Sequence, residues 1–196
     1  MNKSIELEKL KQEMVSDTRL PLKTNLVFGE GNADCQVLFI GEAPGALEDE
    51  LVRPFVGRSG QLLRKCIREL GWKEEDVYIT NIVKRRPPEN RDPSPKEIEF
   101  YKPYLTRQIE IIKPKIIVTL GRFSMSYFLP EAKISRDQGK LRRVETRDEF
   151  APSAGDWYIV PMLHPAYALR GTRAMNIFTK SFKKLPSVIK TVKNEN

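Results

Sequence analysis

Three polar side chains of this 196-residue chain lie directly after short apolar runs, where loops could bring them to a ligand. His164 is the only histidine, and it stands between Leu163 and Pro165. Its imidazole could exchange a proton with a substrate, although a lone histidine can equally be structural. One histidine and two distant cysteines do not form a metal-ligand set, so no metal site is expected.

Glu42 is the second candidate, inside the turn Gly41-Glu42-Ala43-Pro44-Gly45. The glycines allow a ligand to approach the backbone, and the carboxylate could act as a base or offset a positive charge. The alternative is a turn with a solvated acid. Neither Gly-Lys-Ser/Thr nor Gly-x-Gly-x-x-Gly occurs here, which argues against a nucleotide cofactor.

Asn81 and Phe55 could recognise a flat ligand. The Asn81 amide offers both a donor and an acceptor, which reading the edge of a nucleobase requires, but asparagine also commonly closes a strand. Phe55, in Arg53-Pro54-Phe55-Val56-Gly57, could stack on a base or could belong to the core.

Basic residues are concentrated just after Asn81, at Lys84, Arg85, Arg86 and Arg91. Isolated charges are explained by solvation, but a cluster beside a candidate base pocket suits contacts with phosphates. The whole chain carries 34 Lys and Arg against 26 Asp and Glu, a net charge of +8. That excess is compatible with nucleic acid as a partner, and a basic surface that only serves solubility would explain it as well.

Alternating strands and helices must position these residues. Apolar runs predict buried strands at 36–40, 77–83, 115–120 and 157–163, and helical spacing or capping signals predict helices at 4–14, 59–70, 94–113, 121–129 and 176–193. The stretch 140–155 is expected to be a loop or hairpin. We therefore expect an α/β three-layer sandwich with a central, mainly parallel four-stranded sheet, whose carboxyl edge carries the ligand crevice.

Composition bounds the class of protein. With 40% hydrophobic and 31% charged residues, the chain suits a single domain over residues 1–196. Two cysteines give no disulfide framework, and neither a signal peptide nor a membrane span is expected, which favours a cytoplasmic protein.

Taken together, the loop motifs closely resemble the family 4 uracil-DNA glycosylases. The resemblance runs in order from about Thr24 to the C-terminal helix and rests on Gly41–Gly45 with Glu48-Asp49, Arg53–Leu63, Thr80–Lys84, Pro87–Pro93 and His164-Pro165-Ala166. It implies an enzyme that flips uracil out of DNA and hydrolyses the bond between the base and the sugar. The alternative is an inactive or weakly active protein of the same fold that binds uracil in DNA.

The resemblance also implies roles for particular residues. His164 would donate to uracil O2 as negative charge develops, and Glu42 would act near the attacking water. Phe55 would stack on the base, Asn81 would read it, and Gly41 and Glu48 would line the pocket, with Glu48 helping to exclude thymine. The DNA backbone would be contacted by Lys84, Arg85, Arg86, Arg91 and Arg170, and Leu169 or Tyr167 would fill the space left by the base. The expected form is a monomer.

One departure from the family concerns its [4Fe-4S] cluster, which four cysteines hold. The flanking motifs align those positions with Met14, Asp17, Arg85 and Tyr101, and none of these residues can replace a thiolate. We therefore expect no cluster, and a loop ordered by packing and charge instead.

Overall fold

Four parallel strands form the centre of the structure, a computed structural model that describes residues 2–144 and 157–194. They are β2 (Val37–Gly41), β3 (Tyr78–Asn81), β4 (Ile116–Leu120) and β6 (Trp157–Met162). Short antiparallel edge strands, β1 (Glu30–Gly31) and β5 (Arg142–Val144), complete the order β1-β3-β2-β4-β6-β5. The mainly parallel α/β sheet is thus confirmed, and its described part has six strands rather than the expected four.

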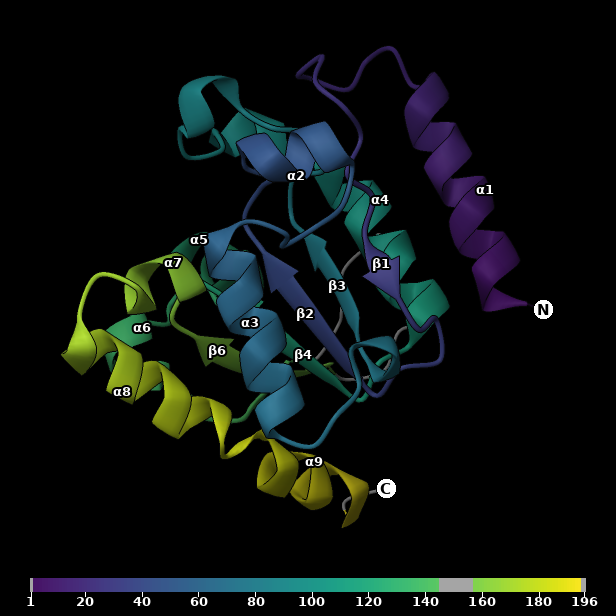
Figure 1. Cartoon of the computed structure of the whole chain (residues 1–196). Coiled ribbons are helices and arrows are strands. Elements are labelled where there is room, and N and C mark those ends of the chain that lie inside the picture. Colours follow the sequence, from purple (N-terminus) through teal and green to yellow (C-terminus); the bar gives the residue numbers. More distant parts are fainter. Residues whose placement is uncertain (1, 145–156, 195–196) are drawn as a thin grey trace.

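Helices cover both faces of the sheet (Figure 1). One face packs against α3 (Arg58–Glu69), α8 (Thr172–Phe182) and α9 (Leu185–Asn194), and the other against α4 (Pro95–Ile112) and α5 (Arg122–Phe128), with α1 (Lys3–Ser16) packed on α4. Alternation along the strands separates two cores: Leu38 and Ile40 of β2 face α4, whereas Val37 and Phe39 face α3. The expected three layers are present.

Local sequence explains the ends of the helices. Ser94 accepts a hydrogen bond from the Glu97 amide at 3.2 Å and donates its own amide to the Glu97 carboxylate at 2.7 Å, a capping box that starts α4. The prediction of a single last helix at 176–193 is wrong. Pro186 cannot continue a helix that contains Phe182, so α8 and α9 are separate.

Shorter elements complete the chain: α2 (Ala46–Leu51), α6 (Ile134–Asp137), α7 (Pro165–Ala168) and 3-10 turns at Glu74–Asp76 and Pro88–Asn90. A loop or a hairpin was expected at 140–155, and residues 142–144 form β5, which pairs antiparallel with β6; residues 145–155 lie outside the described part of the chain. No helix in the described part of the chain is long and apolar enough to cross a membrane. The arrows of β2 and β3 point toward the end of the sheet at which α2, α5 and α7 lie, and the candidate residues follow there (Figure 1).

Candidate active site

The loops after β2 and β3 start as a continuation of the sheet. Gly41 is the register partner of Asn81, and beyond them the Ile82 amide donates to the Gly41 carbonyl at 3.0 Å. The Val83 amide then donates to the Glu42 carbonyl, also at 3.0 Å. Backbone hydrogen bonds alone therefore fix the position of Glu42 relative to Asn81.

Gly41, Phe55 and Asn81 form a cradle. A Cβ atom on Gly41 would lie 2.5 Å from Asn81 Oδ1 and 2.5 Å from Phe55 Cζ, closer than real contacts allow. The side chain of Asn81 is buried, and its Oδ1 has no hydrogen-bond partner among the described residues. Buried acceptors are nearly always paired, so this oxygen is suited to receive a donor from a ligand.

Phe55 is held in an unusual backbone conformation, with φ at 54°. Gly60 of α3 permits it, because a Cβ there would lie 2.0 Å from the Phe55 carbonyl oxygen. The Arg64 guanidinium then donates to the carbonyls of Phe55 and Pro54, each at 2.9 Å. Two carboxylates, Glu30 and Glu74, hold Arg64 in turn. The buried ring thus has a rigid support.

Glu48 lies in α2 and supports the same loop. Its Oε1 accepts hydrogen bonds from the amides of Val56 at 3.0 Å and Gly57 at 2.8 Å. Its other oxygen, Oε2, lies against Gly45, where a Cβ would come within 2.8 Å of it. Glu48 therefore links the turn after β2 to the segment that carries Phe55.

His164 lies at the end of β6 and caps α7. Its Nδ1 accepts a hydrogen bond from the Ala166 amide at 3.1 Å, so the neutral ring carries its proton on Nε2. The ring centroids of His164 and Phe55 are 6.0 Å apart. Burial lowers the pKa of His164 to about 4, despite an opposing effect of the Glu48 charge. At neutral pH the side chain is an uncharged donor.

Glu42 faces the start of α5. A Cβ on Gly121 would lie 2.5 Å from Glu42 Oε1 and 3.2 Å from His164 Cβ, so the glycine at this position leaves room for both side chains. Burial raises the pKa of Glu42 to about 7, and the Asp92 charge adds to the rise, while the Phe123 amide and the Arg122 charge oppose it. A carboxyl group with such a pKa can exchange protons near neutral pH.

Lys84 corrects one sequence-based expectation. The side chain is fully buried, and its Nζ donates to Thr80 Oγ1 and to Gln108 Oε1, the latter at 2.6 Å. Burial moves the pKa of this amine well below its ordinary value. Lys84 therefore cannot contact a DNA backbone. It lies on the α4 side of the sheet, four residues after Thr80.

The other basic residues of the loop keep access to solvent. Arg85 is half-buried and donates to the Thr24 carbonyl, and Arg86 donates to Asn90 Oδ1 at 2.7 Å. Arg91 is exposed and forms an ion pair with the buried Glu97 at 2.6 Å. The hydrogen bond from Arg91 lowers the pKa of Glu97 to about 2. The ion pair and the two hydrogen bonds give the arginines defined positions.

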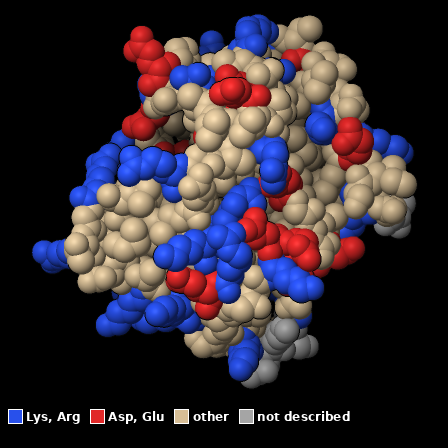
Figure 2. All heavy atoms as spheres, viewed as in Figure 1, with Lys and Arg blue, Asp and Glu red and all other residues tan. Residues whose placement is uncertain are grey.

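Two exposed residues follow α7. Leu169 is 39% exposed, and Arg170 lies over the ring of Tyr167, which is 48% exposed. Lys and Arg side chains line the edge of this face where α7 and α8 lie, whereas acidic and basic side chains mix over α3 (Figure 2). The region is thus both basic and partly apolar.

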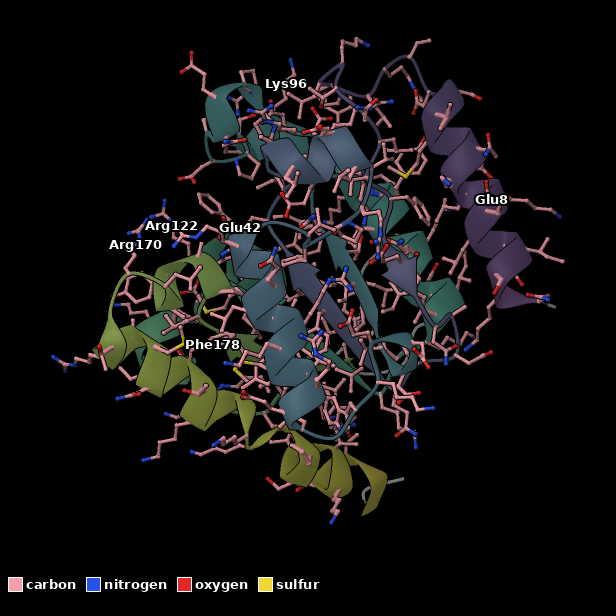
Figure 3. All side chains as sticks on the ribbon, viewed as in Figure 1. Glu8, Glu42, Lys96, Arg122, Arg170 and Phe178 are labelled. Carbon is pink, nitrogen blue, oxygen red and sulfur yellow. The ribbon has the colours of Figure 1, made fainter. Side chains whose placement is uncertain are left out.

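Sequence reasoning did not identify Arg122, Asp92 and Gly121. Arg122 pairs with Asp92 at 2.9 Å and stacks over Phe123. Arg122, Glu42 and Arg170 lie at the same end of the sheet, near α5 and α7 (Figure 3). The signal that could have revealed Gly121 and Arg122 is their place directly after β4, since this edge of a parallel sheet is where ligands bind.

The four positions aligned with cluster ligands do not fit an iron-sulfur cluster. They carry a thioether, a carboxylate, a guanidinium and a phenol, and Met14 and Tyr101 are fully buried. Cys35 and Cys66 are buried in the two separate cores. Within residues 2–144 and 157–194, no group of three or more His, Cys, Asp or Glu could hold a metal ion.

Comparisons with known proteins agree with this geometry. The family model of the uracil DNA glycosylase superfamily matches residues 28–186. A type-4 uracil-DNA glycosylase of Sulfurisphaera tokodaii is 42% identical over 95% of this chain and 86% of its own length. Those of Thermotoga maritima and Archaeoglobus fulgidus are 40% and 39% identical, over 94% and 91% of this chain and 96% and 91% of their own lengths. The chain therefore belongs to the type-4 uracil-DNA glycosylases.

Proposed function

We propose that this protein removes uracil from DNA by hydrolysing its N-glycosidic bond, which releases free uracil and leaves an abasic site. The observation that carries the proposal is the unpaired Asn81 Oδ1, buried in the cradle with Gly41 and Phe55. Uracil offers a donor at N3 and an acceptor at O4, which complement the Asn81 amide. Cytosine presents the opposite pattern on that edge, so it does not match the amide in the orientation that pairs with uracil.

The reacting base must leave the DNA stack to enter this pocket. Phe55 provides a flat apolar surface for the flipped base, and Gly41 leaves room for its edge. As the bond to C1′ breaks, negative charge grows on uracil O2. The Nε2–H of neutral His164 would donate to that oxygen and lower the barrier, because a donor aimed at developing charge acts mainly in the transition state.

Glu42 would act on the sugar side of the reaction. Once ionised, its carboxylate can orient the attacking water and offset the positive charge of the sugar. The raised pKa of Glu42 supports this role, because it lets the group accept a proton near pH 7. Glu48 would keep its place in the pocket wall and help to exclude thymine.

Arginines that keep access to solvent near the pocket would contact the DNA backbone. We assign this role to Arg85, Arg86, Arg91 and Arg170. Leu169 would fill the space that the flipped base leaves in the DNA stack. We assign the same role to Arg122, because it lies near Glu42. The buried Lys84 is left out.

We further propose that the protein works without an iron-sulfur cluster, because the donor set at the four aligned positions is unsuitable for one. A monomer suffices, since one chain supplies all the proposed groups. The two buried unpaired thiols suit the reducing cytoplasm.

The test is a single-turnover excision assay with a labelled oligonucleotide that contains one uracil. Protein purified with a chelator should remove the uracil, so that alkaline treatment then cleaves the strand at the abasic site. A matched strand that contains cytosine should stay intact. His164→Ala provides the control for contaminating activity. Tight binding of the uracil strand without excision would support a uracil-binding protein instead and would refute the enzyme.

A further inference from the structure

Residues 17–24 are hydrogen-bonded to α4 and to the loop after β3. The Tyr101 hydroxyl donates to the Pro21 carbonyl at 2.8 Å, and the Tyr104 hydroxyl to Asp17 Oδ2 at 2.6 Å. Arg85 donates to the Thr24 carbonyl, and Thr24 Oγ1 donates to the Arg86 carbonyl at 3.1 Å. We call these four hydrogen bonds the clasp.

The clasp includes three of the four positions that align with cysteine ligands in the family: Asp17, Arg85 and Tyr101. The fourth, Met14, is fully buried and belongs to the same apolar core as Tyr101. Apolar packing and hydrogen bonds therefore occupy the region where a cluster would join the N-terminal segment, the loop and α4.

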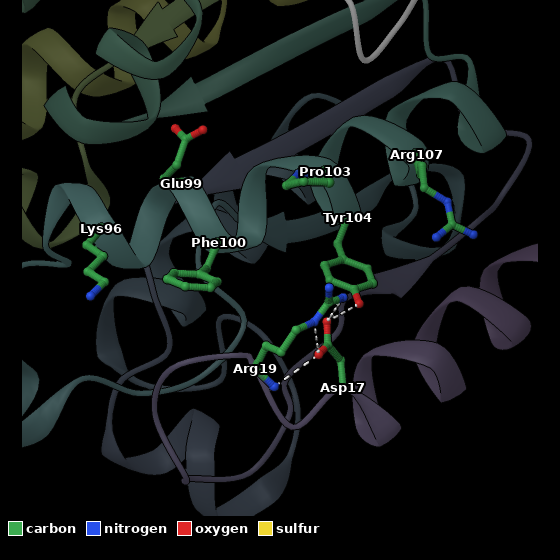
Figure 4. A pocket seen from close by; sticks show the side chains of 8 residues that line it. All are labelled: Asp17, Arg19, Lys96, Glu99, Phe100, Pro103, Tyr104 and Arg107. Atoms are coloured by element: carbon green, nitrogen blue, oxygen red, sulfur yellow. Dashed lines mark hydrogen bonds and ion pairs between the residues drawn. The ribbon is translucent and has the colours of Figure 1, made fainter.

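Charge strengthens both ends of the clasp. Arg85 lies beside the Tyr101 hydroxyl, where its charge opposes the rise in the pKa of Tyr101 that burial causes. At the other end, hydrogen bonds from Arg19 and Tyr104 hold the pKa of Asp17 well below its ordinary value. Asp17, Arg19 and Tyr104 meet at the wall of a groove of about 480 Å³ beside α4 (Figure 4). Hydrogen bonds to charged groups are stronger than neutral ones.

The clasp acts on the loop at the point where the pocket ends. From Asn81, the chain pairs with Gly41 and Glu42 through the amides of Ile82 and Val83, and the Lys84 carbonyl then accepts from the Val27 amide at 2.8 Å. Arg85 and Arg86 follow directly, and both belong to the clasp. Further on, the bond of Arg91 to Glu97 returns the loop to α4. The clasp thus holds the middle of the segment between base pocket and helix.

We propose that Arg85 and Tyr101 are positioning residues that, without metal, hold the 84–91 loop in the geometry that DNA binding requires. The clasp takes the structural place of the family's iron-sulfur cluster in this chain. Its part in DNA binding rests on the proposed function, whereas its hold on the loop does not.

Hydrogen exchange of the DNA-free protein, read by mass spectrometry, tests the hold on the loop. Tyr101→Phe removes only a buried hydroxyl, and Thr24→Val removes only the hydroxyl that donates to Arg86. Each change should speed exchange in peptides covering 18–24 and 82–91 by about 3- to 10-fold and leave β2 and β4 unchanged. Arg107→Met is the matched control, since it breaks an exposed ion pair between α4 and α1 outside the clasp.

A second measurement separates positioning from general stability. Tyr101→Phe cannot touch DNA, because the side chain is fully buried. It should nevertheless weaken binding of uracil-containing DNA by about 3- to 10-fold, while single-turnover excision at saturating protein stays within about 2-fold of wild type. A loss that appears equally in Arg107→Met, or exchange that rises evenly over the whole chain, would contradict a local positioning role.

Two results would overturn the proposal outright. One is unchanged exchange at 82–91 in both Tyr101→Phe and Thr24→Val. The other is stoichiometric iron and sulfide in protein purified without oxygen. If the exchange pattern appears but the wild-type protein does not excise uracil, the clasp holds the loop and the proposed enzyme function fails, so the two failures are distinguishable.

Discussion

We expect the protonation state of Glu42 to give excision a steep pH dependence. With a pKa of about 7, the carboxylate is about 1% ionised at pH 5 and about 90% ionised at pH 8. If the reaction needs the ionised form, the single-turnover rate should rise about 90-fold between these pH values, with a slope near one below pH 7. An ordinary glutamate with a pKa near 4.5 would change by only about 1.3-fold over the same range.

The assay is single-turnover excision at saturating protein, with DNA affinity measured separately at each pH. His164 should not contribute, since its pKa of about 4 keeps it neutral throughout this range. Glu42→Gln is the control, and it should give a slow rate that is independent of pH. A wild-type rate that varies by less than about 3-fold from pH 5 to pH 8 would refute the role of Glu42.

The same shift has a consequence for stability with a definite sign. Because the pKa of Glu42 is raised on folding, the favourable contribution is complete below about pH 4.5 and is lost as pH rises to about 7. The shift corresponds to a contribution of at most about 3 kcal/mol to the free energy of unfolding. Glu42→Gln should therefore unfold at a higher temperature than wild type at pH 8, by up to roughly 10 °C, and the difference should shrink toward pH 5. Calorimetry at both pH values measures it.

Four further substitutions test the site and its surroundings. His164→Ala should lower single-turnover excision by about 100- to 1,000-fold with DNA affinity nearly unchanged, and wild-type excision by this variant would return the histidine to a structural role. Gly41→Ala places a Cβ 2.5 Å from both Asn81 Oδ1 and Phe55 Cζ, so excision should fall by on the order of 100-fold; a rate near wild type would show that the base binds elsewhere. Lys84→Met should lower the melting temperature without changing the salt dependence of DNA binding, whereas Arg170→Ala should reduce that slope by about one, and equal slopes in the two variants would contradict these placements.

The central strands could be predicted because each is a short apolar run that ends at a polar or glycine residue. Helix α4 could be predicted because Ser94 and Pro95 mark its start. Strand β1 has only two residues and β5 has three, one apolar, so neither carries a periodic pattern. Their place depends on backbone pairing with β3 and β6, which local sequence does not encode.

The candidate site could be anticipated residue by residue, but not the side of the sheet on which each residue lies. Lys84 looked like its neighbours Arg85 and Arg86 in a basic loop. Its burial depends on Gln108 of α4, which follows 24 residues later and provides the acceptor. The supports of Phe55 were equally hidden, because Arg64 and Glu30 are brought together only by the fold.

The strand order divides the site into two parts of the chain. The groups assigned to hold the base are Gly41 at the end of β2, Asn81 at the end of β3, and Phe55 in the segment that connects these two strands. The donor His164 instead follows β6, which is separated from β2 by β4. Separate segments of the chain thus carry the residues assigned to recognise the base and the residue assigned to assist its departure. We therefore expect substitutions confined to the later segment to abolish excision and to leave recognition of uracil intact. By this route a protein of this fold would change from removing uracil to binding it, with the base pocket unchanged.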